Sequence, residues 1–118
     1  ERQRLYVQEG GRLTMVFLCS GASTRRRLPP TQHPDDPHDH YGTFRVLAKD
    51  PDHVSNLNPE WNMPYAMRYL AGHWIHVTSR NQYHRLGRPG SHGCVRLHRV
   101  DGIRLYERTP IGTRVVIY

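Results

Sequence analysis

Two runs rich in apolar residues flank a polar, glycine-containing turn near the start of the chain. The run RQRLYVQEGGRLTMVFLCSG, residues 2–21, places β-branched and aromatic residues on both sides of a Glu-Gly-Gly turn. Glycines at a turn accept the positive φ angles that tight hairpins need. The pattern predicts a β-hairpin at the start of the chain.

The rest of the chain divides into extended runs and breaks. Residues 22–41 carry four prolines and no periodicity, which predicts a long exposed loop. The run GTFRVLA, residues 42–48, is typical of a strand, and residues 49–64 are predicted to break up into turns. One or two strands are expected in YAMRYLAGHWIHV, residues 65–77, and a last strand in GTRVVIY, residues 112–118.

One short helix is predicted in RVDGIRLYERT, residues 99–109. Val100, Ile103, Leu105 and Tyr106 have helical spacing, although Gly102 weakens the prediction. The expected fold class is therefore mainly β, with an antiparallel tendency and one short helix.

Length and composition add limits to this picture. A chain of 118 residues holds one domain with a real core, so residues 1–118 are predicted to form a single domain. The chain begins with Glu1, and no apolar run reaches the length of a signal peptide or a membrane span. We therefore expect a soluble fragment or processed form without a transmembrane segment.

The charge is strongly positive and comes almost entirely from arginine. Seventeen Lys and Arg face ten Asp and Glu, giving +7, and Lys49 is the only lysine. The planar guanidinium suits carboxylate and phosphate partners, so nucleic acid, an anionic wall polymer or a merely soluble surface all remain open. The run TRRRLPP, residues 24–30, lacks a stacking motif or recognition helix, so no specific nucleic acid is expected.

Metal binding has little support. The run HPDDPHDH, residues 33–40, has the ligand types of a divalent cation but no rigid ligand spacing, so neither a metal nor another cofactor is expected.

The two cysteines lie in different surroundings. Cys19 sits in an apolar run that predicts a buried structural thiol, and a disulfide with Cys94 stays open as a weaker alternative. Cys94 belongs to SHGC, residues 91–94, after a loop rich in Gly, Pro and Arg. A free thiol with a pKa near ~8.5 needs a neighbour to become thiolate, and an adjacent imidazolium of His92 or His76 would supply the help.

Spacing makes a catalytic arrangement possible. Residues 78–90 can form a loop that returns the chain beside the strand of His76, with Gly87, Pro89 and Gly90 supplying turns. Gly93 lets a substrate approach the main chain, whose N–H groups near Cys94 would bind an oxyanion.

His76, the fourteen residues that follow it and then SHGC resemble the signature of the L,D-transpeptidase catalytic domain, the YkuD-like family. The flanking runs MPYAMRYLAGHWIHV, HGCVRL and GTRVVIY, and the opening hairpin, resemble the same family. The resemblance implies a β-sandwich-like fold with the helix after the cysteine motif.

The resemblance also implies roles for individual residues. Cys94 would be the nucleophile and His76 its base, with the main-chain carbonyl of Val77 orienting the imidazole. His92, Gly93 and Cys94 would frame the oxyanion site. Ser91 and Arg96 would hold the loop or the substrate.

Further residues have two interpretations each. Arg96 either binds a substrate carboxylate or pairs with Asp101. Tyr65, Tyr69 and Trp74 either line the donor pocket or belong to the core. The loop residues Tyr83 and His84 either act as a lid over the substrate or are simply solvated.

The activity implied by the resemblance is cysteine L,D-transpeptidation. A peptidoglycan stem peptide would form a thioester on the enzyme and pass to a second stem's amine, with ping-pong kinetics, outside the cytoplasm in the periplasm or cell wall. A carbapenem would be captured covalently. Two alternatives stay open: an L,D-carboxypeptidase or endopeptidase that gives the same acyl-enzyme to water, and a noncatalytic basic module that binds wall polymer or nucleic acid.

Overall fold

The computed structural model describes residues 3–21, 42–54, 62–70, 73–88 and 94–117. Its elements are β1 (Arg4–Glu9), β2 (Arg12–Ser20), β3 (Gly42–Arg45), β4 (Ala48–Val54), β5 (Asn62–Leu70), β6 (His73–Val77), the 3-10 helix η1 (Arg80–Arg85), β7 (Val95–Leu97), α1 (Arg99–Arg108) and β8 (Arg114–Ile117). The fold is mainly β with one short α-helix, as predicted. The proline-rich loop predicted over residues 22–41 lies outside the described residues.

The predicted hairpin is confirmed. Strands β1 and β2 pair antiparallel, and Gly10 and Gly11 join them with φ angles of 57° and 77°. Two successive positive φ angles match the twist of the two strands, which is why glycine stands at both positions.

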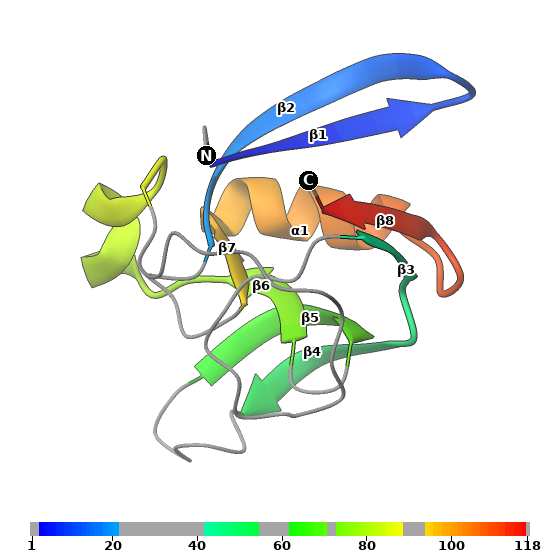
Figure 1. The fold of residues 1–118 in the computed structure, drawn as a ribbon. Coiled ribbons are helices and arrows are strands. Elements are labelled where there is room, and N and C mark those ends of the chain that lie inside the picture. The colour runs from blue at the N-terminus through cyan, green and yellow to red at the C-terminus, as the bar shows by residue number, and fades with distance from the viewer. Residues whose placement is uncertain (1–2, 22–41, 55–61, 71–72, 89–93, 118) are drawn as a thin grey trace.

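Six strands form one sheet in the order β1-β2-β7-β6-β5-β4, and β3 pairs with β8 in a second, two-stranded sheet. All pairs are antiparallel except β6 and β7, which run parallel. Figure 1 shows the β1–β2 hairpin at one end of the sheet, the β4–β5 pair at the other, and α1 between them. A parallel pair needs a long connection, and η1 lies within the connection from β6 to β7.

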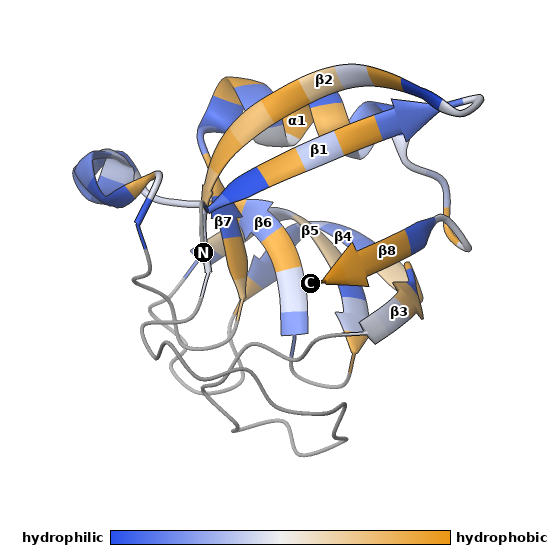
Figure 2. Ribbon diagram, turned by 45° about the horizontal axis from the view of Figure 1, so that its top comes forward, coloured by the Kyte–Doolittle hydropathy of each residue, from blue (hydrophilic) through white to orange (hydrophobic). Residues whose placement is uncertain are grey.

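The core lies where these layers meet. The inward side of the hairpin contributes Phe17 and Cys19, α1 contributes Leu105, and β3 and β8 pack Phe44 and Val115 against the same cluster. Figure 2 shows hydrophobic residues along much of β2, and burial along the end of this strand alternates, with Phe17 and Cys19 buried and Val16 and Leu18 exposed. A sheet curved over a helix and a second small sheet is the sandwich-like arrangement that was expected.

The helix begins and packs as its sequence requires. His98 is the N-cap, and its Nδ1 accepts a hydrogen bond from the N–H of Val100 at 3.1 Å. Gly102 lies in the helix interior, where a Cβ would meet the side chain of Val77. Gly102 therefore lets α1 approach β6 closely, which explains the residue that weakened the helix prediction.

One part of the strand prediction was wrong. Residues 49–64 were expected to form turns, but Lys49–Val54 belongs to β4 and β5 already begins at Asn62. Strand β4 contains Pro51, and it is the last strand of the sheet. An edge strand tolerates proline because one side of its backbone has no ladder partner, so the proline signal did not exclude a strand.

The hairpin is tied to the segment that leads toward Cys94. The N–H of Gly87 donates to the carbonyl of Cys19 at 2.8 Å, and the hydroxyl of Ser20 donates to the carbonyl of Arg88 at 2.6 Å. These two bonds join parts of the chain that are 68 residues apart. The connection after η1 is thus fixed to the sheet by strand β2.

Candidate active site

The parallel pairing of β6 and β7 brings the two motifs of the sequence together. His76 lies opposite Arg96 in the register of the two strands. Cys94 precedes Arg96 by two residues, so an extended chain places its side chain on the same face, roughly 7 Å further along the strand. The side chain of Val77 points the other way, toward α1. We call the side of the sheet that bears Trp74, His76 and Arg96 the catalytic face.

The imidazole of His76 is held in one orientation. Its Nδ1 lies 2.8 Å from the carbonyl oxygen of Val77. A carbonyl accepts only, so Nδ1 carries the proton and donates it, which leaves Nε2 as an unprotonated acceptor. The structure therefore contains the Val77 contact that the resemblance implied, and the free ring nitrogen is the one a general base needs.

Burial keeps His76 uncharged. Its residue is 7% exposed. Burial lowers the pKa of His76 to about 4, the hydrogen bond to Val77 acts in the opposite direction, and the positive charges of Arg96 and His53 lower the pKa further. At neutral pH the ring is an imidazole. The expectation that an imidazolium of His76 assists the thiol at rest was therefore wrong, because a charged ring is too costly in this buried position. His92, the other histidine considered, lies outside the described residues, and its assistance stays a prediction.

Arg96 supplies a positive charge instead. Burial lowers the pKa of Arg96, the charge of Arg85 lowers it further, and Cys94 raises it. A guanidinium whose charge is favoured by a nearby sulfur favours the thiolate form of that sulfur in return. Neither of the two interpretations of Arg96 included this electrostatic interaction with Cys94, and both stay predictions.

Sequence reasoning missed His53. Its ring stacks on Trp74 with centroids 3.9 Å apart, and its Nδ1 lies 3.2 Å from a carboxylate oxygen of Asp50. Its charge is one of those that act on His76. No sequence signal distinguished His53, because it lies in the segment that was predicted to form turns. Trp74 therefore packs beside the base on the catalytic face.

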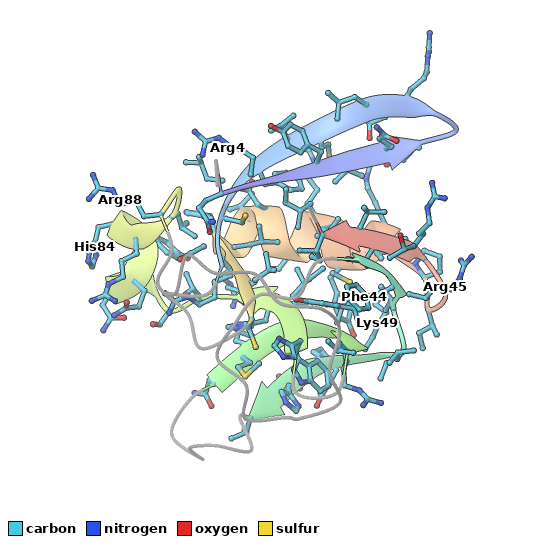
Figure 3. All side chains as sticks on the ribbon, in the orientation of Figure 1. Arg4, Phe44, Arg45, Lys49, His84 and Arg88 are labelled. Carbon is cyan, nitrogen blue, oxygen red and sulfur yellow. The ribbon has the colours of Figure 1, made fainter. Side chains whose placement is uncertain are left out.

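Two predicted substrate residues lie elsewhere. The ring of Tyr65 packs edge-on against Tyr106 of α1 at 5.4 Å, on the helix side of the sheet. Tyr83 in η1 packs on His98 with ring centroids 4.3 Å apart. The role of both residues in substrate binding stays a prediction. Figure 3 shows His84 and Arg88 on the outer side of the η1 segment, away from the sheet.

The cysteines match their predicted environments, and the rest of the motif is not described. Cys19 is buried and Cys94 is half-buried, and both are thiols rather than a disulfide. Tyr69 is 3% exposed and packs on Phe44, so its core interpretation is confirmed. Ser91, His92 and Gly93 lie outside the described residues, and the oxyanion site that they were predicted to frame stays a prediction.

The described residues contain no cluster of three or more His, Cys, Asp or Glu side chains that would hold a metal ion. The run HPDDPHDH lies outside them. No helix in the described ranges has the length and apolar character of a membrane span.

Solved structures of L,D-transpeptidases share this fold. One from Mycobacterium smegmatis has a TM-score of 0.80 and 20% identity, covering 99% of this chain and 54% of that one. One from Xylanimonas cellulosilytica has a TM-score of 0.75 and 28% identity, covering 98% of this chain and 55% of that one. The L,D-transpeptidase LdtMt1 in complex with imipenem has a TM-score of 0.80 and 16% identity, covering 99% and 55%. The chain thus spans about half the length of these proteins.

No curated protein matches the chain in sequence. The family model of the L,D-transpeptidase catalytic domain, in contrast, matches residues 1–117. This match covers nearly the whole chain, including His76, Cys94 and every described strand. The chain therefore belongs to the L,D-transpeptidase catalytic domain family.

Proposed function

We propose that residues 1–118 form a single catalytic domain that transfers peptidoglycan stem peptides through a thioester on Cys94. The observation that carries this proposal is the register of β6 and β7, which sets His76 and Arg96 opposite each other, while Cys94 precedes Arg96 by two residues in the chain. The family match supports the same activity.

The first half-reaction forms the acyl-enzyme. The sulfur of Cys94 attacks the carbonyl carbon of a stem peptide bond, and its proton passes to Nε2 of His76. The tetrahedral intermediate collapses, the C–N bond breaks, and the leaving amine takes the proton from His76. A thioester remains on Cys94. The main-chain N–H groups at positions 93 and 94 would hold the oxyanion.

The second half-reaction releases the product. An acceptor amine attacks the thioester carbon and gives a proton to His76, the C–S bond breaks, and the proton returns to the sulfur. Because the pKa of His76 is held at about 4, the ring is neutral before each half-reaction and gives its proton up readily. Arg96 stabilises the sulfur anion whenever the thiol is ionised.

Intact-mass measurement after incubation with imipenem tests the proposal. We expect one covalent adduct on the wild-type chain and none on Cys94→Ala, because only a nucleophilic thiolate opens the lactam. Cys19→Ala is the matched control and should retain the adduct, since Cys19 is buried. An adduct that survives Cys94→Ala would overturn the assignment of the nucleophile.

Product analysis with stem peptides and an acceptor amine then separates transfer from hydrolysis. We expect the cross-linked product, with initial rates that follow ping-pong kinetics. Release of the free acid alone would replace transfer by the carboxypeptidase or endopeptidase alternative. Wall-polymer binding that is unchanged in Cys94→Ala, without turnover in the wild type, would favour the noncatalytic alternative.

The proposed substrate also gives the proposed location. Peptidoglycan lies outside the cytoplasmic membrane, so we place the working domain in the periplasm or cell wall. The excess of arginine, with a net charge of +7, fits an anionic polymer as the surrounding surface.

A further inference from the structure

A concave site lies beside the start of α1. It is a cavity of about 480 Å³, within the usual size range of small-ligand sites. Its lining residues come from the starts of β5 and α1, the end of β6 and the helix η1. They are Asn62, Pro64, Val77, Thr78, Ser79, Arg80, Tyr83, His98, Arg99 and Val100. We call this cavity the arginine pocket.

The arginine pocket is separate from the reacting groups. Its wall includes Val77, whose side chain points toward α1, whereas His76 lies on the opposite, catalytic face. Neither His76 nor Cys94 lines it. The pocket nevertheless begins one residue from the base along the chain, so a polymer could reach both places.

The pocket has positive charge that no acidic residue among the described ranges neutralises. Arg80 and Arg99 line it together with no acidic residue. Over the described ranges neither guanidinium forms an ion pair, and Asp101 in the first turn of α1 is not part of the lining. Two arginines that line one cavity bring like charges together, and an anion with paired oxygens that bridges them would offset their repulsion.

Hydrogen bonds inside the pocket leave donors for an anion. Nδ1 of His98 accepts from the N–H of Val100, so the ring proton of the neutral imidazole stays on Nε2. The hydroxyl oxygen of Tyr83 accepts from the N–H of Arg99 at 3.4 Å, which leaves the hydroxyl proton to be donated elsewhere. Packing on an aromatic ring helps to position Arg99, since its guanidinium carbon lies 5.6 Å from the ring centre of Tyr65.

We propose that the arginine pocket binds a carboxylate of the peptidoglycan stem, away from the bond that reacts, and so anchors the polymer on the catalytic domain. The proposal rests on the proposed function, because that function makes a stem peptide the substrate. A peptide carboxylate matches the guanidinium fork, the pocket's size and its aromatic walls. The occupant is one stem, and a phosphate-bearing occupant is an outcome of the test below.

The test is a titration followed by backbone amide NMR shifts, in a Cys94→Ala background so that turnover plays no part. The probe is a stem tetrapeptide with free carboxylates. We expect saturable shifts at Thr78, Ser79 and Tyr83. Arg80→Gln combined with Arg99→Gln should weaken binding at least about tenfold, the loss expected for charged hydrogen bonds. Arg104→Gln, an exposed arginine elsewhere on α1, is the charge-matched control and should stay within about twofold.

Two further titrations identify the chemistry. The same tetrapeptide with every carboxylate amidated should lose the shifts, and inorganic phosphate at equal concentration should bind more weakly than the free peptide. Unchanged affinity in the double variant, or equal binding of the amidated peptide, would overturn the proposal. Stronger binding of phosphate would also overturn it and assign the pocket to a phosphate-bearing polymer.

These outcomes do not depend on whether the catalytic assignment holds. The covalent imipenem adduct on the wild-type chain tests Cys94 alone. An adduct without peptide binding at the arginine pocket would refute the pocket only. Peptide binding without an adduct would refute the proposed chemistry only.

Discussion

His76 combines two requirements that usually conflict, a buried position and a proton-transfer role. The main-chain carbonyl of Val77 fixes the ring and leaves Nε2 open, while burial removes the charge that would otherwise block the lone pair. The ring is therefore ready at any pH well above about 4. A surface histidine with its ordinary pKa would lose this readiness at mildly acidic pH.

This environment predicts a pH-dependent stability. The folded-state pKa of about 4 lies below the ordinary 6.5 of His76. Between these values the unfolded chain binds a proton that the folded chain lacks, so the free energy of unfolding falls as the pH drops, by about 3 kcal/mol in total. Urea unfolding at pH 4, 5, 6 and 7 measures this, and His76→Gln should flatten the slope over that range.

His84→Gln is the control for this measurement. His84 is exposed on the outer side of η1, and its replacement should leave the slope as in the wild type. A slope in His76→Gln equal to that of the wild type would show that His76 is not the group responsible.

Arg96 predicts a second effect of charge. Removing its guanidinium disfavours the sulfur anion of Cys94, so the pH midpoint of alkylation by iodoacetamide should rise in Arg96→Gln, and the rate at pH 7 should fall roughly three- to tenfold. The midpoint and the rate of Arg96→Lys should lie between those of the wild type and Arg96→Gln. Arg88→Gln, which removes an outward-facing arginine, should behave as the wild type. An unchanged midpoint in Arg96→Gln would remove Arg96 from the mechanism.

At the scale of elements, the contact between α1 and β6 links stability to the site. Gly102→Ala should destabilise the domain, although alanine favours helices by about 1 kcal/mol, because the new Cβ meets Val77 and overpacking costs about 1–3 kcal/mol. We expect a net loss of about 1 kcal/mol or more in urea unfolding. Imipenem acylation should also slow, since Val77 carries the carbonyl that orients His76.

Arg104→Ala is the matched change on the same helix. Arg104 is exposed, and its replacement should alter neither the unfolding curve nor the acylation rate measurably. Equal stability of Gly102→Ala and the wild type would mean that α1 shifts without cost.

The sequence predicted elements whose local pattern agrees with their place in the fold. The hairpin, the strands around His76, the helix after the cysteine motif and the last strand all show such agreement. Strand β4 was missed because an edge position overrode the signal of Pro51, and the parallel pairing of β7 could not be foreseen from a run of three residues.

Some features of the candidate site could be predicted from the sequence and others could not. The spacing of His76 and SHGC pointed to a base and a nucleophile, whereas the neutral state of the ring and the neighbourhood of His53 depend on burial and on contacts between distant strands. Periodicity contains no information about either, because both depend on contacts between strands that are separated in the sequence.

At the scale of the whole molecule, one core cluster joins the hairpin, the sheet, α1 and the small sheet. The chain should therefore unfold in one cooperative transition. Tryptophan fluorescence and far-ultraviolet circular dichroism, recorded on the same urea series, should give the same midpoint. Two separated midpoints would show that residues 1–118 are not a single domain.

Because β6 and β7 pair in parallel, catalytic activity should depend on the register between these two strands. Sliding one strand by a single position would move the sulfur about 3.3 Å and turn it to the wrong side of the sheet, so no partial activity should survive a slip. Insertions in the connection from β6 to β7, which contains η1, can lengthen that connection without changing the register of the two strands. An insertion variant that still forms the acyl-enzyme must therefore have kept the native register of β6 and β7.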